Sequence, residues 1–152
     1  RNNPGINVTI IDSEYAMPLL KKNIAEAGMV DRIKLVTGDF VSHCFSEKFD
    51  IILLFNVLHE HREEYNRDLL GKIRSSLSEK GSLIILDGMK EKKISRLLDL
   101  TERMYSLLFF HFLGGRNYSY DEIKTWLEVS GFRSAKRSEL YSSGFTMIRA
   151  GS

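Results

Sequence analysis

Short apolar runs alternate along the chain with segments whose apolar residues recur at helical spacing. Four runs rich in aliphatic and β-branched residues predict strands at 6–11, 32–39, 49–56 and 82–87. The runs at 49–56 and 82–87 are apolar at nearly every position, which is typical of strands buried on both faces of a parallel sheet. The pattern therefore predicts a mostly parallel sheet.

Segments with helical spacing separate or follow these strands, and they predict helices at 18–28, 65–81, 94–112 and 119–131. Pro18 suits the first position of a helix, and Gly28 suits the residue after its end. The second predicted helix carries Leu77 on its apolar face. In the last helix, Ser119 and Glu122 have the spacing of a capping box, in which the two side chains satisfy backbone N–H groups of the first turn.

The C-terminal stretch predicts two strands around a Ser-Ser-Gly turn, which would form an antiparallel hairpin within 138–150. The alternation of strands and helices favours a layered α/β fold with a mostly parallel sheet. Neither a linker nor an internal repeat interrupts this order. We therefore expect residues 1–152 to belong to one α/β domain.

Composition and charge exclude several classes of protein. The 152 residues, 43% of them hydrophobic and 28% charged, suit a single globular domain. A net charge of +2 from 22 basic and 20 acidic residues is too balanced for a nucleic-acid-binding surface. No apolar run approaches the roughly 20 residues of a membrane-spanning helix, so no membrane association is expected. The single cysteine, Cys44, excludes an internal disulfide and fits a reducing, cytoplasmic setting.

Acidic residues that follow the predicted strands could bind a nucleoside. In open α/β sheets, ligands bind beyond the carboxyl ends of the strands. Asp12 follows the first run and could accept hydrogen bonds from two ribose hydroxyls, while Asp39 follows the second and could meet an adenine amino group. Each aspartate could equally serve a turn or a helix start. The joint pattern is more specific than either residue alone.

The stretch FNVLHEH at 55–61 follows the third predicted strand and leaves three roles open for His59. A histidine with an ordinary pKa of roughly 6.5 could abstract a proton near neutral pH. His59 and His61 could share a metal ion, although no third ligand stands out in the sequence. His59 could also be a structural or substrate-lining residue. We interpret His43 and His111 as incidental, because neither has a carboxylate or cysteine at ligand spacing.

Five stretches together resemble a known family: INVTIID, AEAGMVDRIKLVTGDF, FDIILLFNVLHEHREE, LLGKIRSSLSEKGSLIILD and FLGGRNYSYDEIKTWLEVSGF. They look like the S-adenosylmethionine-dependent methyltransferases of the Rossmann-like class. More narrowly, they resemble the small-molecule O-methyltransferases of the caffeic acid, isoflavone and hydroxyindole type. The resemblance covers nearly the whole chain, and it implies transfer of a methyl group to a hydroxyl of a small, aromatic molecule.

The resemblance also implies roles for particular residues. His59 falls where the family has its catalytic base, and Asp87 matches an acidic position that orients this histidine. Two positions would line the acceptor pocket together with Asn56, namely Leu108 and Phe112. Five would bind the cofactor S-adenosylmethionine, namely Asp12, Ser13, Asp39, Phe40 and Asn56. An alternative is a non-catalytic protein, or one that methylates nitrogen or carbon, in which His59 is structural.

One signature of the family does not occur in this sequence, namely the glycine-rich loop that follows the first strand. The resemblance therefore implies that 1–152 is a partial catalytic domain, with the family's first strand, that loop and the first helix upstream of Arg1. We expect this part alone to be inactive and to bind the cofactor weakly or not at all. A homodimer could form through the missing N-terminal region or through strand edges left unpaired.

Overall fold

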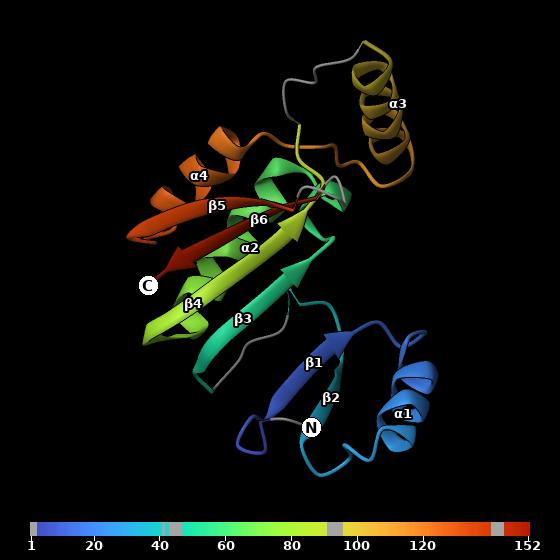
Figure 1. Ribbon diagram of the computed structural model, residues 1–152, viewed down its shortest axis with the longest axis vertical. Coiled ribbons are helices and arrows are strands. Elements are labelled where there is room, and N and C mark those ends of the chain that lie inside the picture. Colours follow the sequence, from blue (N-terminus) through green and yellow to red (C-terminus); the bar gives the residue numbers. More distant parts are fainter. Residues whose placement is uncertain (1–2, 41, 43–46, 91–95, 141–144) are drawn as a thin grey trace. The chain divides into compact units, whose positions relative to one another are not determined.

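The structure is a computed structural model that describes residues 3–40, 42, 47–90, 96–140 and 145–152. The chain divides into two compact units, Arg1–Cys44 and Phe45–Ser152, and each has its own sheet (Figure 1). His43, Cys44 and the predicted Ser-Ser-Gly turn at 142–144 lie outside the described residues.

The first unit is a parallel strand–helix–strand arrangement. Its elements are β1 (Val8–Asp12), α1 (Met17–Glu26) and β2 (Ile33–Thr37). Pro18 lies in the first turn of α1, and Gly28, just beyond its end, has a φ of +66°, as the sequence predicted. Asp12 pairs with Thr37 in register, so the two strands end at the same edge of this sheet.

The second unit contains a four-stranded sheet in the order β3-β4-β6-β5 (Figure 1). Its strands are β3 (Phe49–Phe55), β4 (Leu77–Asp87), β5 (Ser134–Leu140) and β6 (Phe145–Gly151). The β3 and β4 strands are parallel, and β6 runs antiparallel to both β4 and β5. The predicted α/β fold with a C-terminal antiparallel hairpin is confirmed.

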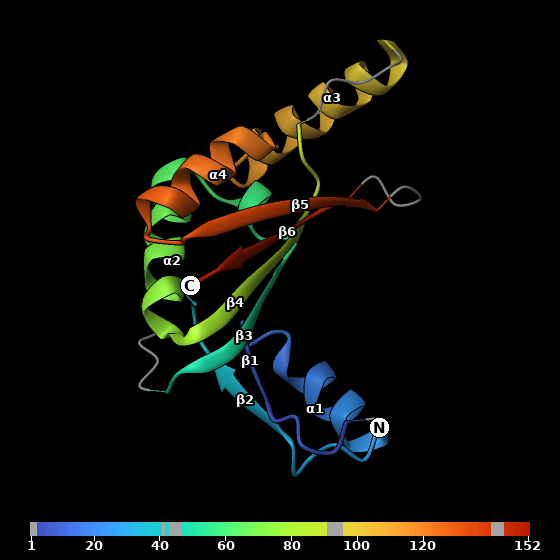
Figure 2. The ribbon, with the colours of Figure 1, turned by 60° about the vertical axis from the view of Figure 1, so that its left-hand side comes forward.

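Two helices of the second unit cover the same face of this sheet (Figure 2). The helical elements are η1, a short 3-10 helix (Leu58–Glu60), α2 (Glu63–Ser76), α3 (Arg96–Phe112) and α4 (Tyr120–Val129). Under α2 and α4, Leu83, Ile85 and Ile148 are fully buried. The opposite face of β3 carries exposed apolar side chains, since Ile51 is 58% and Leu53 56% exposed. Among the described helices, none is both long and apolar enough to cross a membrane.

Within the part of the chain that the structure describes, each sheet has open strand edges, among them those of β1 and β3. There, β1 pairs with β2 alone, and β3 pairs with β4 alone. Open edges present unpaired N–H and C=O groups that can accept a further strand.

One predicted boundary is wrong. Helical spacing predicts that the second helix continues to residue 81, but α2 ends at Ser76. Leu77 already has the extended backbone of β4, with φ −81° and ψ 147°. Leu77 pairs with Phe49 and is buried, with 3% of its surface exposed. Its apolar side chain suits the core in either conformation, so helical spacing alone could not show that the backbone changes at this residue.

Candidate active site at the end of the parallel strands

The parallel strands β3 and β4 end beside each other and present polar residues at a common edge. Phe55 pairs with Leu86, and the next residues are Asn56 and Asp87. Asn56 donates its backbone N–H to the Leu86 carbonyl at 2.9 Å and takes a φ of +55°, a conformation that asparagine tolerates better than most residues. This left-handed residue terminates β3 and directs the chain into η1.

The residues Leu58–His61, which we call the histidine turn, bring His59 against Asp87. His59 Nδ1 lies 2.6 Å from Asp87 Oδ1, and the second carboxylate oxygen, Oδ2, accepts the Leu58 backbone N–H at 2.9 Å. Both side chains are shielded from water, with 13% of His59 and 3% of Asp87 exposed. One buried carboxylate therefore binds both the imidazole ring and the backbone next to it.

The environment of His59 favours its charged form. The hydrogen bond to Asp87 raises the pKa of His59 above its ordinary value of 6.5, burial lowers it, and the charges of Asp87 and Glu60 raise it again. The Phe109 ring of α3 lies over the imidazole, with 4.4 Å between ring centroids and 34° between ring planes. The imidazole therefore has an aromatic neighbour on one face and a carboxylate at Nδ1.

Side chains from distant elements hold the backbone of the histidine turn. Asn66 of α2 is completely buried, and its Nδ2 donates to the Leu58 carbonyl at 2.9 Å and to the His61 carbonyl at 3.2 Å. The Tyr118 hydroxyl, whose pKa is raised by burial, also donates to the His61 carbonyl, at 2.7 Å. Gly115 packs so closely that an added Cβ would lie 2.1 Å from the His59 carbonyl oxygen.

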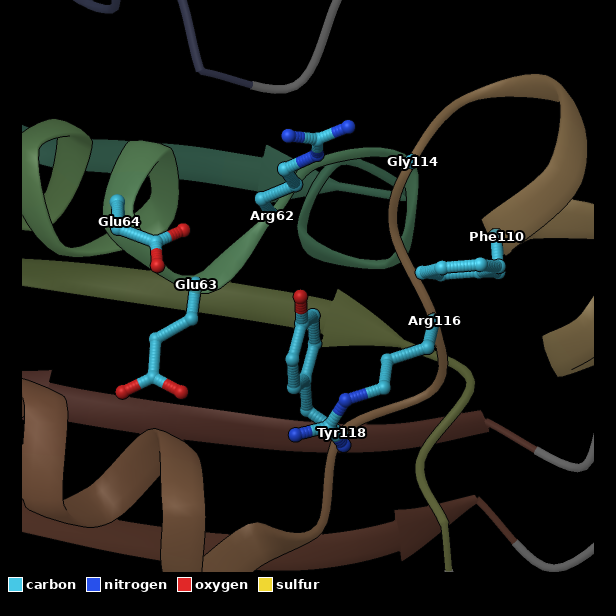
Figure 3. Close-up of a pocket in the computed structure, with 7 residues that line it drawn as sticks. All are labelled: Arg62, Glu63, Glu64, Phe110, Gly114, Arg116 and Tyr118. Carbon is cyan, nitrogen blue, oxygen red and sulfur yellow. The ribbon is translucent and has the colours of Figure 1, made fainter.

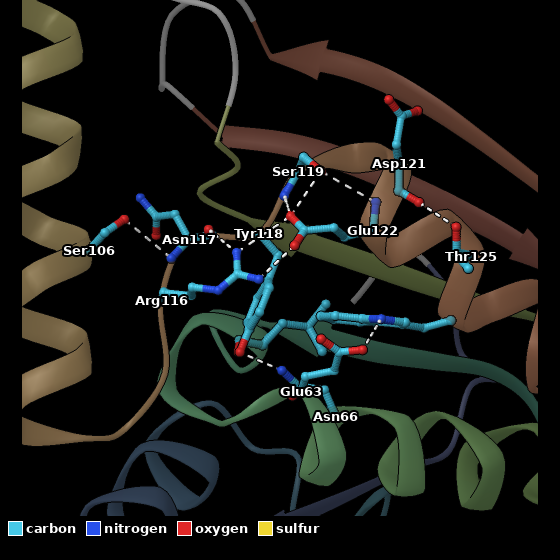
Figure 4. A network of polar contacts seen from close by, with 12 residues as sticks. Glu63, Asn66, Ser106, Arg116, Asn117, Tyr118, Ser119, Asp121, Glu122 and Thr125 are labelled. Atoms are coloured by element: carbon cyan, nitrogen blue, oxygen red, sulfur yellow. Dashed lines mark hydrogen bonds and ion pairs between the residues drawn. The ribbon is translucent and has the colours of Figure 1, made fainter.

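The loop that carries Gly115 and Tyr118 is itself bound to α4 (Figure 4). Arg116 Nη2 donates to Glu122 Oε1 at 2.6 Å and its guanidinium lies 4.3 Å from the centre of the Tyr118 ring. The predicted capping box is confirmed, since the Ser119 hydroxyl accepts the Glu122 N–H and Glu122 accepts the Ser119 N–H. Burial raises the pKa of Glu122, but the hydrogen bonds from Arg116 and Ser119 outweigh it and leave that pKa at about 2.

A pocket of about 420 Å³ lies beside this loop (Figure 3). Its walls come from the start of α2, from α3 and from the loop, and consist of Arg62, Glu63, Glu64, Phe110, Gly114, Arg116 and Tyr118. None of the predicted site residues lines it. Its Phe110 wall comes from the same helix as the predicted acceptor residues Leu108 and Phe112, which are exposed by 47% and 73%. We therefore locate the candidate chemistry at the His59–Asp87 pair, where titratable groups converge.

The predicted cofactor residues divide between the two units. In the first unit, Asp12 is the last residue of β1 and Ser13 follows it, while Asp39 and Phe40 follow β2. Gly38 donates its N–H to the Asp12 carbonyl at 3.1 Å. The Asp12 side chain is exposed, and its Oδ1 accepts the Ser13 N–H at 2.7 Å. Asn56 belongs to the second unit. Asp12 and Asp39 thus lie at one edge of the first unit, as expected for strands that end together.

His61 and His59 contact different residues. The His61 ring stacks on Tyr65 of α2, with ring centroids 4.0 Å apart, whereas His59 meets Asp87 and Phe109. In the described ranges, no three histidine, cysteine, aspartate or glutamate side chains gather in a way that could hold a metal ion.

Four residues around the histidine turn were missed by sequence reasoning: Asn66, Phe109, Gly115 and Tyr118. Asn66 carried a usable signal, because it lies three, four and seven residues before Leu69, Leu70 and Ile73 on the buried face of α2. A polar side chain on an apolar face indicates a specific hydrogen-bond partner. The other three carried no local signal that connects them with His59.

Comparison with known proteins adds a family and several relatives. The family model of the O-methyltransferase domain matches residues 1–133. A 3-hydroxy-5-methyl-1-naphthoate 3-O-methyltransferase from Streptomyces sahachiroi is 27% identical over 151 residues, which are 99% of this chain and 43% of that protein. An L-tyrosine C(3)-methyltransferase from Streptomyces lavendulae is 36% identical over 87 residues, or 57% of this chain and 24% of the relative.

A solved structure shares the fold. The structure of PigF with SAH superimposes with a TM-score of 0.79 at 23% identity, covering 97% of this chain and 44% of that one. The chain thus spans less than half the length of each of these relatives.

Proposed function

Because the chain belongs to the O-methyltransferase domain family, we propose that it is part of an enzyme that methylates a hydroxyl of a small, aromatic molecule from S-adenosylmethionine. In this proposal His59 is the general base and Asp87 orients it. The observation that carries the proposal is the 2.6 Å contact between His59 Nδ1 and the buried carboxylate of Asp87.

This contact suits His59 for proton abstraction. A carboxylate that accepts at Oδ1 requires the proton of the neutral imidazole to be on Nδ1, so Nε2 keeps its lone pair. When an acceptor hydroxyl donates to Nε2, its proton moves to the ring, and Asp87 stabilises the imidazolium that forms. The fixed backbone of the histidine turn would keep Nε2 in one position while the substrate binds.

When bound, S-adenosylmethionine would supply a methyl group activated by its positively charged sulfur, for transfer to the deprotonated oxygen of the acceptor. The residues of the first unit suit the nucleoside part of this molecule. One Asp12 oxygen accepts the Ser13 N–H, and the exposed carboxylate has further acceptor capacity for ribose hydroxyls. We assign adenine to Asp39 and Phe40, and the acceptor to Asn56, Leu108 and Phe112, by position in the family.

Full cofactor binding would need a further strand. The free edges of β1 and β3 support this part of the proposal, because each can accept a strand that the described residues do not supply. We therefore expect this 152-residue chain to bind S-adenosylmethionine weakly or not at all. Isothermal titration calorimetry tests this expectation, and tight one-to-one binding would contradict it.

Replacement of His59 by glutamine in the longer protein that carries this chain tests the base. We expect turnover to fall by roughly 10²–10⁴-fold, with cofactor affinity unchanged. His111, exposed on α3, provides the matched control in a His111→Gln variant. Because the pKa of His59 is raised, the midpoint of the acid limb of the pH–rate profile should lie above pH 6.5. Unchanged turnover in His59→Gln, together with an unchanged profile, rules out the base.

Methylation of carbon is the second candidate, and the tyrosine C(3)-methyltransferase relative favours it. A phenol that loses its proton to His59 gains electron density on the adjacent ring carbons as well as on oxygen. The same base could therefore serve either reaction. Carbon-13 NMR of the product formed from methyl-labelled cofactor separates them, because methyl groups on oxygen and on carbon have well separated chemical shifts.

A further inference from the structure

The histidine turn has few hydrogen bonds of its own. Its internal bond runs from the His61 N–H to the Leu58 carbonyl at 3.3 Å, and a single 3-10 turn leaves most of its backbone groups to outside partners. Asn66 supplies two such bonds from one nitrogen, to the carbonyls of Leu58 and His61. These two residues lie immediately before His59 and immediately after Glu60.

We propose that Asn66 is a positioning residue for His59, because its amide joins the two ends of the histidine turn and thereby holds the imidazole at bonding distance from Asp87. The inference deepens the proposed function and rests on His59 being the base. Both of these hydrogen bonds from Asn66 go to backbone carbonyls, so it acts through the backbone of the turn.

Contacts from Asp87, Asn66 and Gly115 fix the backbone from which the His59 side chain projects. Asp87 Oδ2 holds the Leu58 N–H, and Asn66 Nδ2 holds the Leu58 and His61 carbonyls. Gly115 then closes off the His59 carbonyl, leaving no room for the turn to move toward it. Since a hydrogen bond of 2.6 Å weakens steeply when its atoms separate, a shift of about 1 Å in the turn would break the His59–Asp87 contact.

The amide of asparagine is specific for this task. Its two N–H donors match two carbonyl acceptors, whereas leucine has the same branched shape and no donor. Tyr118 adds one donor to the His61 carbonyl, so its loss should loosen only that end of the turn. Ser76 offers a matched control, because it is buried on the same helix but its hydroxyl donates to the Lys72 backbone carbonyl, away from the histidine turn.

NMR titration of the histidines in the 152-residue chain tests the inference without any activity assay. The charged groups that act on His59 are Asp87 from β4 and Glu60 from the turn itself, while α3 contributes the uncharged ring of Phe109. In Asn66→Leu we expect the pKa of His59 to fall toward 6.5, because the bond to Asp87 is lengthened. Tyr118→Phe should lower it less, and Ser76→Ala should leave it unchanged.

The result that overturns the inference is a His59 titration in Asn66→Leu and Tyr118→Phe that matches the wild type. Should Asn66→Leu fail to fold, Asn66→Ala decides, since it also removes both donors and adds no bulk. In the longer protein, Asn66→Leu should lower kcat by roughly ten- to a hundredfold with little change in KM, and shift the acid limb to lower pH. If His59→Gln retains full turnover while the NMR shifts appear, the proposed base fails but the positioning role stands.

Discussion

The edge where β3 and β4 end and the edge where β1 and β2 end both present an aspartate, but they hold it differently. Asp87 is 3% exposed and accepts from Leu58 and His59, which lie 29 and 28 residues earlier in the chain. Asp12 is exposed, and the hydrogen bond that its carboxylate accepts comes from the next residue, Ser13. Tertiary contacts thus fix the Asp87 carboxylate against His59, whereas the exposed Asp12 carboxylate keeps acceptor capacity for a further donor.

Among the substitutions that test this comparison, Gly115→Ala should have the largest effect on stability. The new Cβ would lie 2.1 Å from the His59 carbonyl and 2.6 Å from the backbone of Glu60, so either the loop or the histidine turn must move. We expect a loss of about 3 kcal/mol in the free energy of unfolding, measured by urea titration with the fluorescence of Trp126.

The matched control is Gly71→Ala in α2, where nothing lies within 4 Å of an added Cβ. Alanine is the better helix former, so this variant should be more stable by about 0.5–1 kcal/mol. Equal effects of the two substitutions would show that the close approach of Gly115 to the turn does not matter.

Asp87→Asn should have the second-largest effect. Asparagine keeps the shape of aspartate, but its amide presents an N–H donor to either the Leu58 N–H or His59 Nδ1, which are donors themselves. We therefore expect the free energy of unfolding to fall by about 2 kcal/mol. Asp12→Asn is the matching change at the other edge, and there the loss should stay within about 0.5 kcal/mol. Amide hydrogen exchange measures both units in one sample, and a larger loss for Asp12→Asn would reverse the comparison.

A smaller effect is expected for Glu122→Gln, which weakens the bond between α4 and the loop that packs on the histidine turn. The pKa of Glu122 is lowered from 4.5 to about 2, so its contribution to stability is present above pH 4.5 and is lost as the pH falls toward 2. Both partners are more than a third exposed, at 39% for Arg116 and 35% for Glu122, and screening by solvent reduces this contribution to about 1 kcal/mol.

The corresponding variant in the first unit is Glu26→Gln. Its partner Lys22 lies 3.9 Å away, with both side chains about two-thirds exposed, at 69% and 65%. Such a pair contributes at most about 0.5 kcal/mol. Urea titrations at pH 3 and pH 6 measure both variants; if Glu122→Gln destabilises equally at the two pH values, the assigned cause is wrong.

The smallest effect is the dependence of stability on the charge of His59. Its folded-state pKa is raised, so the stabilisation is complete below pH 6.5 and is lost as the pH rises through the raised pKa. His59→Gln should therefore destabilise the second unit more at pH 6 than at pH 9. The difference should vanish in an Asp87→Asn background, because both residues contribute to one interaction.

The sequence by itself determined the order of strands and helices, the capping box at Ser119 and the parallel pairing of the apolar runs. The elements and the capping box follow from local rules, since periodicity, glycine and short-range hydrogen bonds act over a few residues. The parallel pairing follows from runs that are apolar on both faces. The resemblance placed His59 and Asp87 in one site, and the structure brings them into contact.

Only the tertiary structure decided how the histidine turn is held. The turn is contacted by α2, α3 and the loop before α4, through Asn66, Phe109, Gly115 and Tyr118. The helical pattern marks Asn66 as a buried polar residue but does not identify its partners, and the other three carry no local signal. Tertiary structure likewise sets the end of α2, because Leu77 pairs with Phe49 and so belongs to β4. Residues far apart in sequence acquire a common role through packing, and spacing along the chain does not reveal it.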